Sequence, residues 1–161
     1  MAAFKKRRVG RTSLEVTELG FGSATIAGML GTDVPQEQAR ATVTAAVDAG
    51  IGYFDTAPHY GFGRSEHLMG DALRFRDADR VLSTKCGRLL VPVRSEAERT
   101  VEHPWTQPFP FEIRYDYSYD AIRRSFEDSL QRLGLSKIDI LLVHDIGVQT
   151  HGAEQNAIYW R

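Results

Sequence analysis

An alternation of short apolar runs with longer amphipathic stretches constrains the fold of this chain more than any other feature. The apolar runs, which we expect to be strands, lie at residues 19–22, 51–54, 81–86 and 138–143. Stretches with helical periodicity separate each run from the next. Strands that alternate with helices predict a parallel sheet with right-handed crossovers, and therefore the α/β fold class.

The expected helices carry start and stop signals. The first lies between Pro35, which suits a first helical turn, and Gly50, which supplies a left-handed stop. A second helix is expected to begin at Ser65 as its N-cap. A third should begin at Ser118 or Asp120 and end at the glycine at position 134.

Three further elements complete the expected order. A small β-hairpin is predicted from strands at 7–9 and 14–17, joined by turn residues 10–13. The run at 138–143 is apolar except for Asp139, which predicts a strand covered on both faces. The run at 19–22 is expected to be a short buried strand that ends in glycine.

Two segments do not fit the alternation. Residues 87–117 are rich in proline and aromatic side chains and are interpreted as a long loop, for which we favour an ordered lid over a flexible linker. Residues 145–161 show no clear periodicity, and their apolar ending is typical of a chain interrupted before its next element.

Composition excludes several classes of function. With 20 Lys+Arg and 21 Asp+Glu the formal charge is −1, which argues against nucleic-acid binding and against a polybasic membrane anchor. The basic N-terminus is not followed by the apolar core of a signal peptide, and no run reaches the roughly 18 apolar residues of a membrane span. The single cysteine, Cys86, fits a reducing compartment. We therefore expect a soluble, cytoplasmic protein.

Chemically useful residues occur where the predicted strands end. These ends carry Gly22-Ser23, Asp55, Lys85 and His144-Asp145, and Tyr60 follows Asp55 by five positions. Ligands of parallel α/β folds lie at this edge of the sheet. Each residue alone has an ordinary interpretation: a capping aspartate, a solvated lysine, a hydrogen-bonded core histidine or a packed tyrosine. Their joint placement favours a functional site.

Such a set is suited to proton transfer at a carbonyl or an alcohol. A lysine cation about 4 Å from a phenolate stabilises it by about 4 kcal/mol at an effective dielectric constant of about 20. In this hypothesis Lys85 lets Tyr60 act as acid and base, and Asp55 holds Lys85 in place. His144 donates a hydrogen bond to the reacting oxygen.

Reduction by this set would also need a hydride carrier. Two Gly-x-Gly stretches, at 20–25 and 61–66, lack the third glycine of a Rossmann fingerprint, and no Walker loop occurs. The histidines and Cys86 show no metal-ligand spacing, so no metal site is predicted. Cys86 beside Lys85 has the setting of a reactive thiol, but a buried strand cysteine is the favoured interpretation.

Several stretches together resemble the aldo-keto reductases. They are DAGIGYFDTAPHYG at 48–61, SEHLMG at 65–70, STK at 83–85, and SLQRLG at 129–134 leading to DILLVH at 139–144. The resemblance implies a (β/α)₈ barrel that binds NADPH or NADH without a Rossmann domain. It implies catalytic roles for Asp55, Tyr60, Lys85 and His144, with Tyr60 as general acid or base. It also places Gly22, Ser23 and Asp55 near the nicotinamide ribose.

The insertion at 87–117 and the His144-Asp145 pair look more like the branch of the family that oxidises aldoses such as fucose, or pyridoxal, with NAD(P)⁺. Length is the main departure, because a closed barrel of this kind needs about 250 residues and this chain has 161. We therefore expect residues 1–161 to form the N-terminal part of a single barrel domain, with the hairpin and about four β/α units.

The C-terminal half, with most of the cofactor-holding surface, is expected to be absent, and the chain alone to be inactive. Two alternatives stay open. One is a non-catalytic half-barrel that serves as an interaction module or self-associates through its open edge. The other is a non-redox barrel enzyme, such as an isomerase, that uses the lysine and the histidine.

Overall fold

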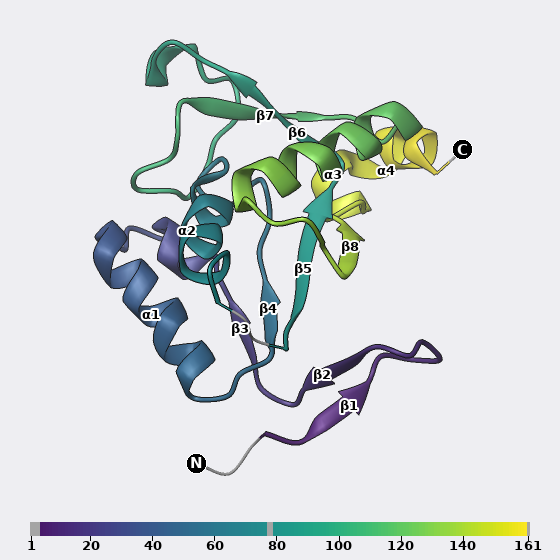
Figure 1. Cartoon of the computed structure of the whole chain (residues 1–161). Helices are drawn as coiled ribbons and strands as arrows, with labels where there is room; N and C mark the ends of the chain where they lie inside the picture. The colour runs from purple at the N-terminus through teal and green to yellow at the C-terminus, as the bar shows by residue number, and fades with distance from the viewer. Residues whose placement is uncertain (1–3, 77–78, 161) are drawn as a thin grey trace.

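A four-stranded parallel sheet forms the centre of the computed structural model, which describes residues 4–76 and 79–160 (Figure 1). The strands lie in the order β3 (Gly20–Gly22), β4 (Tyr53–Asp55), β5 (Val81–Cys86) and β8 (Ile140–Val143). The crossovers contain α1 (Gln36–Asp48), α2 (Arg64–Leu73) and α3 (Tyr119–Leu133). The predicted α/β class and parallel sheet are confirmed.

The three crossover helices cover one face of the sheet. The core between them contains Phe54 and Leu82 from the strands, together with residues of α1 and α2 such as Val43 and Met69. Helices α2 and α3 approach each other closely at Gly70, where a Cβ atom on this residue would lie 2.1 Å from the carbonyl oxygen of Leu133. Only glycine permits this contact, which explains a residue that is otherwise unfavourable inside a helix.

Hairpins lie at the two ends of the sheet (Figure 1). The predicted N-terminal hairpin is confirmed as β1 (Lys6–Arg8) paired antiparallel with β2 (Glu15–Thr17). The prediction of a loop over 87–117 is wrong, because this segment contains a second hairpin of β6 (Arg88–Pro92) and β7 (Phe111–Tyr115). Prolines near the strand ends obscured the period-two pattern in the sequence.

Helix ends follow the sequence signals in α1 and α3 but not in α2. Helix α1 follows Pro35, as predicted. Ser118 caps α3, since its side chain accepts a hydrogen bond from the Ala121 amide, and Gly134 ends this helix in a left-handed conformation. The prediction that Ser65 caps the second helix is wrong. Gly63 precedes α2, and the Ser65 hydroxyl is buried and donates to Ser23 Oγ at 2.6 Å.

The two outer strands are more exposed than predicted. We expected β3 and β8 to be buried, but each lies at an edge of the sheet, and Leu141, Leu142 and Val143 are 38–45% exposed. An apolar composition alone does not distinguish a central strand from an edge strand. The C-terminal segment also differs from expectation, since it contains α4 (Val148–Tyr159), a helix interrupted at Gly152 and buried only at Asn156.

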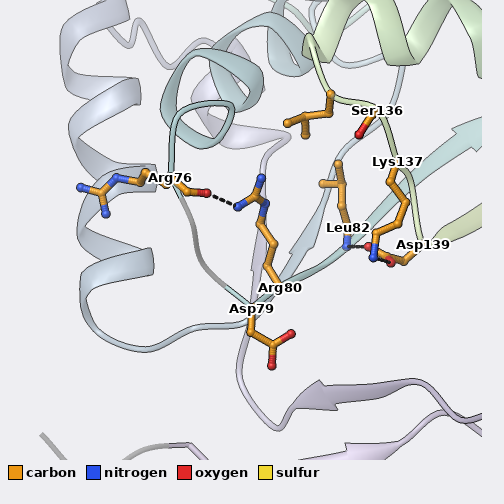
Figure 2. A pocket seen from close by; sticks show the side chains of 8 residues that line it. Arg76, Asp79, Arg80, Leu82, Ser136, Lys137 and Asp139 are labelled. Carbon is orange, nitrogen blue, oxygen red and sulfur yellow. Dashed lines mark hydrogen bonds and ion pairs between the residues drawn. The ribbon is translucent and has the colours of Figure 1, made fainter.

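A small hollow of about 280 Å³ lies where β5 and β8 begin (Figure 2). Asp139, the one charged residue in the last apolar run, lies there and accepts hydrogen bonds from the Leu82 amide at 2.9 Å and from Lys137 Nζ at 2.6 Å. Its carboxylate therefore fixes the entry of β8 into the sheet. Each helix within residues 4–76 and 79–160 is too short or too polar to span a lipid bilayer.

Candidate functional site

Asp55 and Lys85 lie on the face of the sheet opposite the helices. Asp55 ends β4, and its backbone pairs with Ser83 of β5, so Lys85 lies two residues farther along the neighbouring strand. Strand alternation sends Phe54 and Leu82 into the helix-covered core and leaves Asp55 and Lys85 on the other side. Lys85 Nζ donates to Asp55 Oδ2 at 2.7 Å and to the carbonyl oxygen of Thr56 at 2.9 Å.

Tyr60 reaches the same place from the turn between β4 and α2. Its amide donates to the carbonyl oxygen of Ala57 at 3.1 Å, which tightens the turn. The ring lies under the lysine cation, with Lys85 Nζ 4.7 Å from the ring centroid. Within the described ranges the Tyr60 hydroxyl forms no hydrogen bond, so it remains available to a ligand.

His144 follows β8 and closes the set. Its amide donates to the carbonyl oxygen of Cys86 at 3.0 Å, and its ring meets that of Tyr60 edge-on, with centroids 5.7 Å apart. Burial, then the positive charges of Arg88 and Lys85 and the neighbouring His59, lower the pKa of His144 to about 2. The imidazole is therefore neutral, and its 3.6 Å approach to Asp145 is neither an ion pair nor a hydrogen bond.

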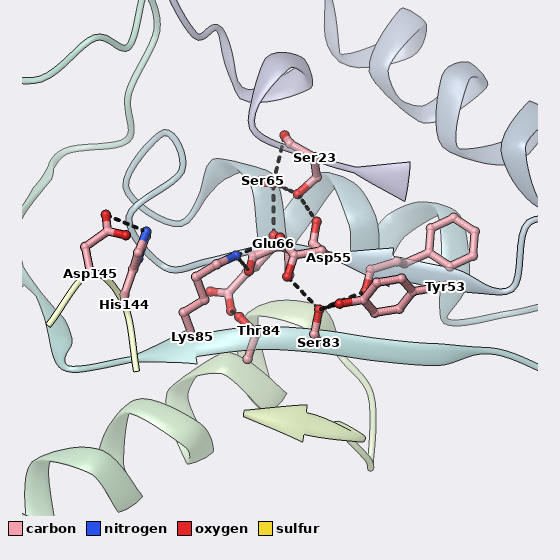
Figure 3. Close-up of polar contacts among 12 residues, drawn as sticks. Ser23, Tyr53, Asp55, Ser65, Glu66, Ser83, Thr84, Lys85, His144 and Asp145 are labelled. Atoms are coloured by element: carbon pink, nitrogen blue, oxygen red, sulfur yellow. Dashed lines mark hydrogen bonds and ion pairs between the residues drawn. The ribbon is translucent and has the colours of Figure 1, made fainter. Parts of the chain in front are cut away.

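The structure thus brings together the four side chains that we predicted to be catalytic: Asp55, Tyr60, Lys85 and His144. Figure 3 shows how three of these, Asp55, Lys85 and His144, lie at the ends of the strands. The residues come from three different strands or the turns that follow them. Their convergence follows from the parallel sheet, whose strand ends share one rim.

Gly22 and Ser23, two of the three residues predicted beside a cofactor, differ in accessibility. Ser23 is fully buried, and its hydroxyl donates to the carbonyl oxygen of Asp55 at 2.8 Å and accepts from Ser65. Gly22 is exposed, pairs with Asp55 in the ladder, and has open space where a Cβ would lie. A ligand can therefore approach the Gly22 backbone. Ser23 is too buried to touch a ligand, and its hydroxyl instead holds the backbone of Asp55.

A cavity of about 750 Å³ lies between the N-terminal hairpin and the strands β3 and β4, and its lining includes Arg7, Thr17 and Glu18 together with Gly20, Gly22, Tyr53 and Asp55. At its Gly22 end a flat ring can lie against β3, because Gly22 has no side chain and has open space where a Cβ would lie. The Asp55 carboxylate has about four lone-pair sites, and two of them accept from the side chains of Ser83 and Lys85. It can therefore also accept a hydrogen bond from a ribose hydroxyl.

Three residues near the site were not predicted: His59, Arg88 and Trp105. The His59 ring lies 5.3 Å from Trp105 and 5.7 Å from His144, and burial, Arg88 and His103 lower its pKa to about 3. The Arg88 guanidinium is almost wholly buried and donates to Asp145 Oδ2 at 2.8 Å. Arg88 could have been predicted to lie near the site, because it follows Lys85 by only three residues. No such signal was present for Trp105, which lies in the connection between β6 and β7.

Cys86 is a buried, free cysteine of β5. Burial raises the pKa of the Cys86 thiol, which supports the interpretation of an inert strand cysteine. Among the described residues, no three His, Cys, Asp or Glu side chains lie close enough together to hold a metal ion.

The chain is similar to known proteins over most of its length. The model of the Aldo/keto reductase family matches residues 18–158. Pyridoxal 4-dehydrogenase of Microbacterium luteolum is 44% identical over 99% of this chain and 48% of its own length. D-threo-aldose 1-dehydrogenase of a Pseudomonas species is 40% identical over 82% of this chain and 41% of its own length.

A solved structure, the holo form of an aldo-keto reductase from Bacillus halodurans, has a TM-score of 0.65 and 31% identity. The similarity covers 97% of this chain and 45% of that one. The chain therefore spans about half the length of the relatives it matches. Its sheet and helices form an incomplete (β/α)₈ barrel, as expected.

Proposed function

The chain belongs to the aldo/keto reductase family, and from this we propose that it supplies the catalytic side chains of an NAD(P)-dependent oxidoreductase. The reaction interconverts an aldehyde, a ketone or a sugar hemiacetal with an alcohol or a lactone. The four proposed catalytic residues are Asp55, Tyr60, Lys85 and His144.

The position of Lys85 carries this proposal. Its ammonium is held by Asp55 and lies 4.7 Å from the centroid of the Tyr60 ring. A cation about 4 Å from a phenolate oxygen stabilises it by about 4 kcal/mol at an effective dielectric constant of about 20. Tyr60 can therefore give its hydroxyl proton to a carbonyl oxygen during reduction, and take one from an alcohol during oxidation.

His144 has a different role, because a neutral imidazole does not act as a general acid at physiological pH. A neutral imidazole has one N–H, which donates a hydrogen bond to the oxygen on the reacting carbon. This bond orients the oxygen toward Tyr60 and stabilises the negative charge that develops there.

A nicotinamide cofactor would lie beside Gly22 and Asp55, and when bound it would supply or accept the hydride. The chain's own part is to hold the ribose with Asp55 and to leave room for the ring at Gly22. The proposal extends to a small carbonyl compound or aldose as substrate, because the two relatives above are named for pyridoxal and D-threo-aldose. We place the protein in the cytoplasm, with no nucleic-acid or membrane partner.

A second candidate function rests on the exposed apolar edge at β8. A strand with an unpaired edge is a template for another chain. In this alternative the chain is a non-catalytic module that binds a partner or a second copy of itself.

Substitution of Tyr60 tests the first proposal. In a complete barrel that contains this chain, Tyr60→Phe keeps the ring and removes the proton, so oxidation of pyridoxal or an aldose with NADP⁺ or NAD⁺ should slow by about 10²–10⁴-fold. Cofactor affinity, measured by quenching of NADPH fluorescence, should stay nearly unchanged. The matched control is Tyr119→Phe, which alters a tyrosine that is 74% exposed on α3 and should leave both quantities unaltered.

Two results would contradict the assignment. A Tyr60→Phe protein that keeps more than about a tenth of the rate cannot have lost its general acid. A chain that binds neither NADPH nor NADH but self-associates supports the interaction module instead.

A further inference from the structure

Ser83 lies beside the proposed catalytic aspartate and is fully buried. Its hydroxyl donates to Asp55 Oδ1 at 2.6 Å, while Asp55 Oδ2 accepts from Lys85 at 2.7 Å. The hydroxyl of Tyr53 lies 3.2 Å from Ser83 Oγ (Figure 3). One line of polar contacts therefore runs from Tyr53 through Ser83 and Asp55 to Lys85.

The chemistry of the groups fixes the direction of these bonds. A serine hydroxyl has one proton, and a carboxylate can only accept. The short contact to Asp55 is charge-assisted and therefore stronger than the 3.4 Å alternative to the carbonyl oxygen of Phe54. Since Ser83 donates to Asp55, Tyr53 must donate to Ser83.

We propose that Ser83, supported by Tyr53, is a positioning residue that fixes the Asp55 carboxylate so that it holds the Lys85 ammonium over Tyr60. This inference rests on the proposed function, in which that ammonium supports Tyr60. A carboxylate held at one oxygen can rotate about its Cβ–Cγ bond. With Ser83 on Oδ1, rotation would break a short bond, so Oδ2 stays on the lysine.

Strand cohesion does not require this hydroxyl. The backbone ladder already pairs β4 with β5, including Asp55 with Ser83. The next residue, Thr84, points to the other face, where its buried hydroxyl donates to Glu66 Oε1 at 2.7 Å. Thr84 therefore provides a matched control on the same strand that does not touch Asp55.

The exchange of the Lys85 ammonium protons with water measures the proposed effect directly. The chain has four lysines, and Lys5, Lys6 and Lys137 are exposed, so a ¹⁵N-lysine-labelled sample should show one slowly exchanging Nζ signal. In Ser83→Ala this exchange should accelerate by about tenfold, because the charge-assisted bond that fixes the carboxylate is lost. Ser83→Thr keeps a hydroxyl and should restore slow exchange, and Thr84→Val should leave it slow.

Equal Lys85 exchange in Ser83→Ala and the unmodified chain would overturn the proposal, as would equal acceleration in Thr84→Val. If the amide spectrum shows that Ser83→Ala does not fold, Tyr53→Phe decides the question. It should accelerate exchange by a smaller factor, and no change there would overturn the proposal. The measurement needs no cofactor or substrate, so a failure of the proposed oxidoreductase activity would be seen separately, in the turnover assay.

Discussion

His59 and His144 are buried side by side in the site, and their pKa values are lowered to about 3 and about 2. In the unfolded chain both titrate near pH 6.5. Below that pH both histidines are protonated in the unfolded chain but stay neutral in the folded chain. The free energy of unfolding should therefore fall as the solution is acidified. At pH 5 each histidine should cost about 2 kcal/mol relative to pH 8.

Urea denaturation at pH 5 and pH 8 measures this loss. His59→Asn should remove a large part of the pH dependence, because it removes one of the two most perturbed imidazoles. His67→Asn is the control, since His67 is exposed and its pKa is lowered less far. A His59→Asn protein with an unchanged pH dependence would show that His59 is already protonated or solvated in the folded chain.

The sequence indicated the main residues of the site, because residues at the ends of parallel strands must share a rim. Asp55, Lys85 and His144 follow from that rule alone, and the Tyr60 turn follows from the adjacent chain. The support given by Ser83 could not be predicted, since it depends on the register between β4 and β5. Ser65 shows the converse error: a residue typical of a helix cap is instead used as a buried donor to Ser23.

Glu66 joins three secondary-structure elements. It is fully buried on α2, and its carboxylate accepts from Arg132 Nε of α3 at 2.6 Å and from Thr84 of β5. Removing one partner of a buried ion pair leaves an uncompensated charge. Arg132→Met should therefore lower the free energy of unfolding by about 3–5 kcal/mol.

The exposed pair of Arg123 and Glu127 on the same helix provides the comparison. Arg123→Met should cost less than about 1 kcal/mol, because surface ion pairs contribute little. Denaturant midpoints of the two variants give the contrast. Similar midpoints would mean that Glu66 finds another partner, or a proton, when Arg132 is removed.

Element types were predictable where one period dominated a long stretch. Helix α3 combines an apolar stripe with a serine cap and a terminal glycine, and its expected ends were confirmed. The strands β6 and β7 are joined by a long connection, from Pro92 to Phe111, so their pairing is not a local property of the sequence. Helix α4 lacked a signal because only Asn156 is buried and Gly152 interrupts it.

The central sheet, around which the fold is built, has two free edges, β3 and β8. The sequence predicted that the strands would run parallel to one another. It did not predict which strands would be outermost, since that depends on which strands pair with each other. Apolar content suggested burial of β8, whereas Leu141, Leu142 and Val143 are well exposed in the described part of the chain. Exposed apolar edge strands are sites of association.

This edge predicts concentration-dependent self-association of the chain, which sedimentation velocity can measure. Leu142→Lys places a charge on the edge, where Leu142 is 42% exposed, so it should shift the distribution toward monomer at little cost in stability. Phe75→Lys is the matched control, because Phe75 is 91% exposed but lies just after the end of α2, away from the edge. If Phe75→Lys disperses the chain as effectively as Leu142→Lys, association depends on general surface hydrophobicity and not on β8. If both variants and the unmodified chain are monomeric throughout, the free edge is protected by its own twist and side chains.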